Sequence, residues 1–180
     1  MAGFTLAQVA GEVDHGLALI EKSVSLNPNS ANAWIACSFV RTYLGDSDRA
    51  MEHFSRAQRL NPLDPMQFAY WNAAAMAHFC AGRYEEAADA ADKTLYEQPT
   101  YSPALRLRVA TSGLLRRMDE AREYVRRLLA VHPEASVDWF RAFWEAPMRN
   151  NSRTLAKLLE GARLAGLPEG DEPLTQDRSR

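Results

Sequence analysis

The sequence predicts an all-α fold in which antiparallel helix pairs stack side by side into a solenoid. Four prolines, Pro28, Pro62, Pro99 and Pro133, follow one another at intervals of 34, 37 and 34 residues. Within each interval, apolar residues recur at the spacing of one helical face, and a short break separates two such faces. Because proline cannot continue a helix, each proline marks the end of one pair.

The stretch from Trp34 to Pro62 shows this pattern most completely. Its first helix carries the small residues Cys37 and Ser38 three and four positions after the tryptophan, which favours close packing. Gly45 can take the left-handed conformation that ends a helix, and Asp46 is then a candidate N-cap. The apolar face of the second helix follows: Ala50, Phe54 and Ala57.

The same pattern recurs twice downstream. Trp71, Gly82 and Ala87 lie 37 positions after their counterparts, and a third copy follows 34 positions later, with Leu105 for the tryptophan and Arg116 for the glycine. Helix starts are predicted at Ser30, at Asp64 followed by Pro65, and at Ser102. These spacings predict three helix pairs, at about residues 31–64, 65–101 and 102–134.

The two ends of the chain depart from the pattern. Residues 1–29 are predicted to be a degenerate or partial first pair, with a turn at Gly11. Residues 135–168 predict two capping helices, the second starting at Asn151 or Ser152. Residues 169–180 are polar without a period, and we expect them to be disordered.

Composition and motifs limit the classes of function. The chain has 180 residues, a formal net charge of −2 and no apolar run long enough to span a membrane, so we expect a cytoplasmic protein without a nucleic-acid or membrane partner. We find no catalytic motif, phosphate-binding loop or metal-ligand spacing, so we expect no enzyme activity, metal or cofactor. Cys37 and Cys80 are interpreted as packing residues.

The third pair is rich in arginine, with seven between Arg106 and Arg127. One interpretation is a solvated outer helix face. The other is a patch for an acidic peptide or a neighbouring domain. No aromatic platform accompanies the charge, which disfavours nucleic acid.

The periodic pattern resembles the tetratricopeptide repeat, a 34-residue helix–turn–helix unit. This resemblance implies about three and a half units plus C-terminal capping helices, in a right-handed superhelix whose first helices line a concave groove. The matching groove positions are Asn32, Ile35, Phe39, Tyr43, Asn72, Met76, Phe79 and Arg106. The lysine and asparagine clamp that some family members use for a C-terminal carboxylate is absent from these positions. An extended or helical peptide with apolar anchors is the expected guest.

A second surface is a candidate for docking. Trp139, Phe140, Phe143 and Trp144 form one broad aromatic face of a predicted helix. This face would either cover the last repeat or form an exposed docking surface, and it makes homodimerisation an alternative function. The groove could also be filled by the C-terminal helices of the chain itself or by a second copy.

Longer motifs suggest a subgroup. The segments Tyr43-Leu44-Gly45-Asp46, residues 77–84 and residues 160–169 resemble the C-terminal repeat region of bacterial class III adenylate and guanylate cyclases and of related winged-helix regulators. This resemblance covers roughly residues 14–169. It implies the regulatory, protein-binding part of a larger bacterial signalling protein, with any attached N-terminal domain as a further partner and any cyclase activity outside this chain.

Overall fold

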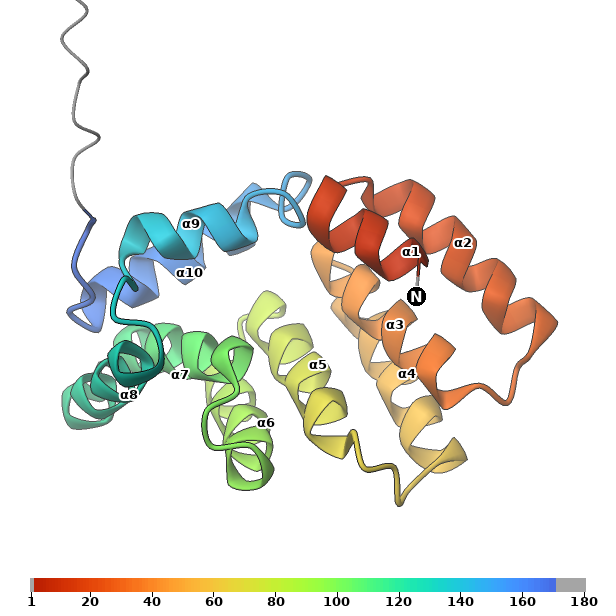
Figure 1. Cartoon of the computed structure of the whole chain (residues 1–180), viewed down its shortest axis with the longest axis horizontal. Helices are drawn as coiled ribbons and strands as arrows, with labels where there is room; N and C mark the ends of the chain where they lie inside the picture. Colours follow the sequence, from red (N-terminus) through yellow and green to blue (C-terminus); the bar gives the residue numbers. More distant parts are fainter. Residues whose placement is uncertain (1, 171–180) are drawn as a thin grey trace, which may run out of the picture.

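The computed structural model describes residues 2–170, and within this range it contains only helices (Figure 1). The predicted all-α solenoid is confirmed. The elements are α1 Ala2–Thr5, the π-helix η1 Leu6–Ala10, α2 Val13–Leu26, α3 Ala31–Tyr43, α4 Ser47–Leu60, α5 Gln67–Cys80, α6 Tyr84–Glu97, α7 Ser102–Leu114, α8 Met118–Val131, α9 Val137–Trp144 and α10 Ser152–Leu164.

Three helix pairs, α3–α4, α5–α6 and α7–α8, follow one another in an arc (Figure 1). The first helices of these pairs, α3, α5 and α7, pack against each other along the inner side of the arc. Apolar side chains at helical spacing are buried between the layers, as Phe54 of α4 and Leu95 of α6 show. Burial of these faces stabilises the stack by roughly 1.5–3 kcal/mol for each large side chain.

The turns between paired helices use one backbone geometry. Gly45 and Gly82 have φ angles of +79° and +76°, and Arg116 takes the same left-handed conformation at +59°. Ser30 is the N-cap of α3, where its hydroxyl accepts a hydrogen bond from the Ala33 amide at 3.3 Å. Asp46 is the N-cap residue of α4, as predicted, but its carboxylate makes no cap bond and instead accepts a hydrogen bond from Arg41 at 3.1 Å.

The start of α5 also differs from the prediction. The helix begins at Gln67 rather than directly after Asp64. The Asp64 carboxylate accepts hydrogen bonds from the Met66 amide at 2.9 Å and from the Tyr70 hydroxyl at 2.7 Å. These bonds lower the pKa of Asp64, and they fix the preceding turn against the helix.

Glycines in the N-terminal helices α1 and α2 have a packing role. A Cβ added to Gly16 of α2 would lie 2.4 Å from the Gly3 carbonyl oxygen. The backbones of α1 and α2 therefore touch, and these glycines allow the contact even though they weaken helix propensity.

The C-terminal helix pair, α9 and α10, lies across the arc (Figure 1). At the N-cap of α10, the side-chain amide of Asn151 donates to the Thr42 carbonyl of α3 at 3.3 Å, and near the other end of the helix Gly161 touches Gly113 of α7. The connection between α9 and α10 reaches the N-terminal turn, since a Cβ on Gly11 would lie 2.8 Å from the Ala146 carbonyl oxygen. The inner side of the arc is therefore bridged from end to end.

The chain after α10 turns back toward α9. The Val137 and Asp138 amides donate to the carbonyl oxygens of Pro168 and Glu169 at 2.8 and 2.9 Å. The disorder predicted for residues 169–180 falls, from residue 171 on, outside the described residues.

Candidate functional site

A central pocket of about 370 Å³ remains on the inner side of the arc. It lies between the N-terminal helices, α3, α5, the start of α7 and the end of α9. Its lining consists of Phe4, Gln8, Asn32, Ile35, Ala36, Phe39, Tyr43, Met66, Ala69, Tyr70, Asn72, Tyr101, Pro103, Phe143 and Trp144. We call this cavity the central pocket below.

Five of the eight predicted groove residues line the central pocket: Asn32, Ile35, Phe39, Tyr43 and Asn72. They come from α3 and α5, which stand next to each other in the arc. The rings of Phe4 and Phe39 lie 5.5 Å apart and form one wall. The other three predicted residues, Met76, Phe79 and Arg106, do not line this pocket.

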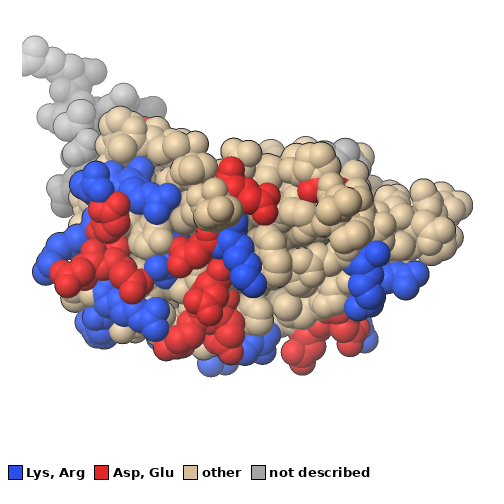
Figure 2. Space-filling model, turned by 90° about the horizontal axis from the view of Figure 1, so that it is seen from below, with Lys and Arg blue, Asp and Glu red and all other residues tan. Residues whose placement is uncertain are grey.

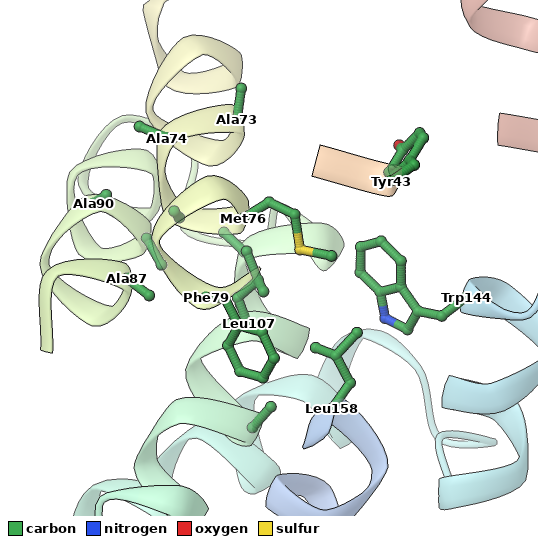
Figure 3. Close-up of a cluster of buried hydrophobic side chains, with 14 of the residues drawn as sticks. Tyr43, Ala73, Ala74, Met76, Phe79, Ala87, Ala90, Leu107, Trp144 and Leu158 are labelled. Atoms are coloured by element: carbon green, nitrogen blue, oxygen red, sulfur yellow. The ribbon is translucent and has the colours of Figure 1, made fainter. Parts of the chain in front are cut away.

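Met76 and Phe79 are covered by the C-terminal helix pair. Their exposed fractions are 1 and 2%. They belong to one buried cluster together with Trp144 of α9 and Leu158 of α10 (Figure 3). This part of the inner surface is thus occupied by the chain itself, one of the interpretations left open by the sequence.

Arg106 is held between two aromatic rings of α9. Its guanidinium carbon lies 4.0 Å from the centroid of Trp139 and 3.8 Å from that of Phe143. Burial lowers the pKa of Arg106 to about 10, against the opposing effect of Glu134. The charge is desolvated, and its attraction to the two π faces binds α9 to α7.

The aromatic face of α9 points toward the repeats. Phe140 and Trp144 are buried, while Trp139 and Phe143 are half-buried around Arg106. Two of its members, Phe143 and Trp144, contribute to the central pocket. The face therefore packs inward. It contacts Arg106 of the last repeat and contributes Phe143 and Trp144 to the central pocket.

The chemistry of the central pocket is apolar and uncharged. Its polar groups are the amides of Gln8, Asn32 and Asn72, the hydroxyls of three tyrosines and the indole N–H of Trp144, and none of the lining residues is ionised at neutral pH. Asn72 is 4% exposed, and its Oδ1 atom has no hydrogen-bond partner within residues 2–170. The hydroxyls of Tyr43 and Tyr101 make no hydrogen bond in this range, and burial raises the pKa of both.

Several lining residues were missed by sequence reasoning. Phe4 and Gln8 come from the weak first pair, which packs beside α3. Met66 and Tyr101 lie just before α5 and α7, in positions that a search for helical faces does not include. Phe4 and Tyr101 are aromatic residues close to helix starts, which was the available signal for these two, whereas Gln8 and Met66 gave none.

The charged residues on the face drawn in Figure 2 do not form a patch of one sign. In Figure 2 the Lys and Arg side chains on the visible face alternate with Asp and Glu side chains. Arg108, one of the third-pair arginines, departs from the solvated-face interpretation: it is 4% exposed and pairs with Asp92 and Glu120, both at 2.8 Å. Its role there is structural.

Residues 2–170 contain neither a metal site nor a membrane-spanning helix. No group of His, Cys, Asp and Glu there could hold a metal ion. None of the helices in that range has the length and apolar character needed to cross a membrane. Cys37 and Cys80 are free, and burial raises their pKa values to about 11 and 12, which keeps both thiols protonated and unreactive at neutral pH.

The repeat assignment is supported by comparison with known proteins. The family model described as tetratricopeptide repeat matches residues 41–102, from the end of α3 to the start of α7. A thermophilic tetratricopeptide repeat protein of Thermus thermophilus superposes with a TM-score of 0.65 over 91% of this chain and 88% of that one, at 19% identity. This chain has a tetratricopeptide repeat fold.

Other solved structures share the fold. MamA has a TM-score of 0.60 at 16% identity, over 86% of this chain and 91% of its own. YrrB, described as a tetratricopeptide repeat protein with an unusual peptide-binding site, has a TM-score of 0.56 at 15% identity, over 89 and 82% of the two chains. No curated protein matches the sequence significantly.

Proposed function

We propose that this tetratricopeptide repeat chain is a non-enzymatic interaction module that binds a segment of another protein in its central pocket. One observation carries the proposal. The C-terminal helix pair covers Met76, Phe79 and Arg106, yet an apolar cavity lined by five predicted groove residues stays open beside it. Apolar cavities with a few converging polar groups are the usual form of binding sites.

The size of the pocket limits the form of the guest. The central pocket has about 370 Å³ of accessible space and is partly open to the surface. This space suits one or two inserted side chains, so of the two guests expected from the sequence we propose the extended segment.

Burial of one aromatic side chain in this pocket removes about 150–250 Å² from water. At about 25 cal/mol per Å², this corresponds to roughly 4–6 kcal/mol before the costs of association. Because ordering a flexible segment offsets part of this gain, we expect dissociation constants in the micromolar to millimolar range.

The proposal is tested with a displayed library of random peptides selected on the full chain. The affinity of the selected peptides is then measured by calorimetry for the wild type and for Ala36→Trp, which puts an indole into the pocket from its α3 wall. We expect a loss of at least about tenfold, a cost of about 1.4 kcal/mol. Ala130→Trp, on the exposed face of α8, is the matched control.

Selected peptides that bind Ala36→Trp as well as the wild type would contradict the pocket as the binding site. Circular dichroism and the melting temperature of both variants show whether the fold is kept. A library that yields no binder to the folded wild type would contradict the interaction function.

We further propose that the module is the cytoplasmic regulatory part of a larger bacterial signalling protein, such as a class III cyclase or a winged-helix regulator. The support is the sequence resemblance of residues 14–169. The full reading frame that encodes this chain, together with the neighbouring genes, tests this proposal. A neighbouring or fused cyclase or winged-helix domain is the expected result, and an unrelated context would contradict it.

Homodimerisation through the aromatic face or the groove remains the alternative prediction. The inward orientation of that face does not favour it. Sedimentation of the wild type at high protein concentration tests homodimerisation, because a protein that stays monomeric under this condition forms no stable dimer.

A further inference from the structure

We infer that the segment enters the central pocket with one uncharged aromatic side chain that carries its own hydrogen-bond donor, tyrosine or tryptophan, and that Asn72 recognises this donor. The inference rests on the proposed function and specifies its guest. Three properties of the pocket carry it: the absence of lining charge, the aromatic walls and the unpaired carboxamide oxygen of Asn72.

The lining excludes a charged anchor. None of the fifteen lining residues carries a charge at neutral pH. The nearby guanidinium of Arg106 is not available to a guest, since it is stacked between Trp139 and Phe143. A carboxylate or an ammonium group would lose its hydration on entry and gain no ionic partner, which disfavours Asp, Glu, Lys and Arg.

The walls favour a flat ring. The aromatic residues of the lining include Phe4, Phe39, Tyr43, Tyr101 and Phe143. Aromatic pairs in offset or edge-to-face contact are more favourable than their buried area alone predicts. An aliphatic anchor would fill the volume without this contribution.

Asn72 distinguishes among aromatic anchors. Its side chain is nearly fully buried at the wall formed by α5, and the Oδ1 atom lacks a partner within the described range. In either orientation the carboxamide offers an acceptor and a donor. A buried polar group without a partner is unfavourable, so a guest hydroxyl or indole N–H that donates to Asn72 removes this cost, whereas phenylalanine leaves it in place.

The test uses blocked amino acids as probes: N-acetyl-tyrosinamide, N-acetyl-tryptophanamide, N-acetyl-phenylalaninamide and N-acetyl-glutamic acid amide. Each is titrated into the full chain to about 20 mM, above the millimolar dissociation constants expected for ligands of this size, while amide chemical shifts are followed by NMR. We expect the tyrosine and tryptophan probes to bind about 2- to 12-fold tighter than the phenylalanine probe, the range of one net hydrogen bond.

The matched variant is Asn72→Leu, which keeps the side-chain shape and removes the carboxamide. It should bring the tyrosine and phenylalanine affinities to the same value without abolishing phenylalanine binding. Asn29→Leu, at an exposed position before α3, should keep the wild-type preference. Thermal melts show whether Asn72→Leu is folded, and the ratio of the two affinities within one variant does not depend on its stability.

The outcomes separate this inference from the proposed function. Equal tyrosine and phenylalanine affinities in the wild type, or tightest binding by the glutamic acid probe, would overturn the inference and leave peptide binding intact. Shift changes confined to residues outside the pocket would overturn it as well. A tyrosine probe that binds as tightly as the selected peptides would identify the ligand as a free small molecule and overturn the assignment to a protein segment.

Discussion

Gly113 of α7 and Gly161 of α10 are in direct backbone contact. A Cβ placed on Gly113 would lie 2.0 Å from the Gly161 carbonyl oxygen, and one placed on Gly161 would lie 2.3 Å from the carbonyl oxygen of Ala110. No side chain larger than hydrogen fits at either position. This contact holds the C-terminal helix pair against the last repeat.

Gly161→Ala should destabilise the protein, although alanine is the better helix former. The added methyl group must push α10 away from α7, and overpacking of this kind costs about 1–3 kcal/mol. For a chain of this size the melting temperature should fall by about 2–4 °C per kcal/mol. The control is Ala156→Leu on the exposed face of α10, which should change stability by less than about 0.5 kcal/mol. An unchanged melting temperature for Gly161→Ala would contradict the contact.

Arg106→Ala should destabilise the protein by about 2–4 kcal/mol. The change removes the side chain between Trp139 and Phe143, and with it the cation–π attraction and the packing of its methylene groups. Urea unfolding followed by tryptophan fluorescence measures the effect. Arg122→Ala, which removes an exposed arginine of α8, is the control and should change stability by less than about 0.5 kcal/mol. Equal effects of the two substitutions would show that the stacked arginine does not hold α9.

The stability of the protein should fall above pH 9 because of its two buried thiols. Burial raises the pKa of Cys37 from 9.0 to about 11 and that of Cys80 from 9.0 to about 12. The unfolded chain therefore loses these protons first, so the stabilisation is complete below pH 9 and is lost as the pH rises through 11.

Urea unfolding at several values between pH 8 and 10 tests this pH dependence. The variant Cys37→Ala/Cys80→Ala should lose less stability per pH unit than the wild type, by up to about 1.4 kcal/mol for each thiol. Parallel curves for the two proteins would assign the alkaline loss to other groups, such as the tyrosines.

Arg116→Gly should stabilise the protein by about 0.5–1 kcal/mol. Arg116 has a φ angle of +59° at the turn where the two preceding pairs have glycine. The left-handed conformation costs a residue with a Cβ about 1 kcal/mol, and the flexibility of glycine in the unfolded chain offsets part of the gain. Arg117→Gly, at a φ angle of −85°, should be neutral or destabilising in the same urea measurement. A loss of stability in both variants would contradict the strain.

The local pattern of the chain was predictable because it depends on neighbours in sequence. Proline spacing, glycine or its substitute at the turn, and apolar residues at helical intervals predicted the paired helices, and the caps at Ser30 and Asn151 are present. The start of α5 was predicted too early, because the Asp64 carboxylate fixes the turn before the helix by accepting from the Met66 amide and the Tyr70 hydroxyl. Asp46 stands at the predicted N-cap position, but its carboxylate accepts from Arg41.

The sequence by itself determined a solenoid of helix pairs, since repeat spacing and helical periodicity are properties of the chain alone. Only the tertiary structure decided which inner residues remain accessible. Burial of Met76 and Phe79 and the stacking of Arg106 depend on the C-terminal helix pair crossing the arc. That crossing rests on contacts between residues such as Asn151 and Thr42, 109 positions apart, for which no local periodicity gives a signal.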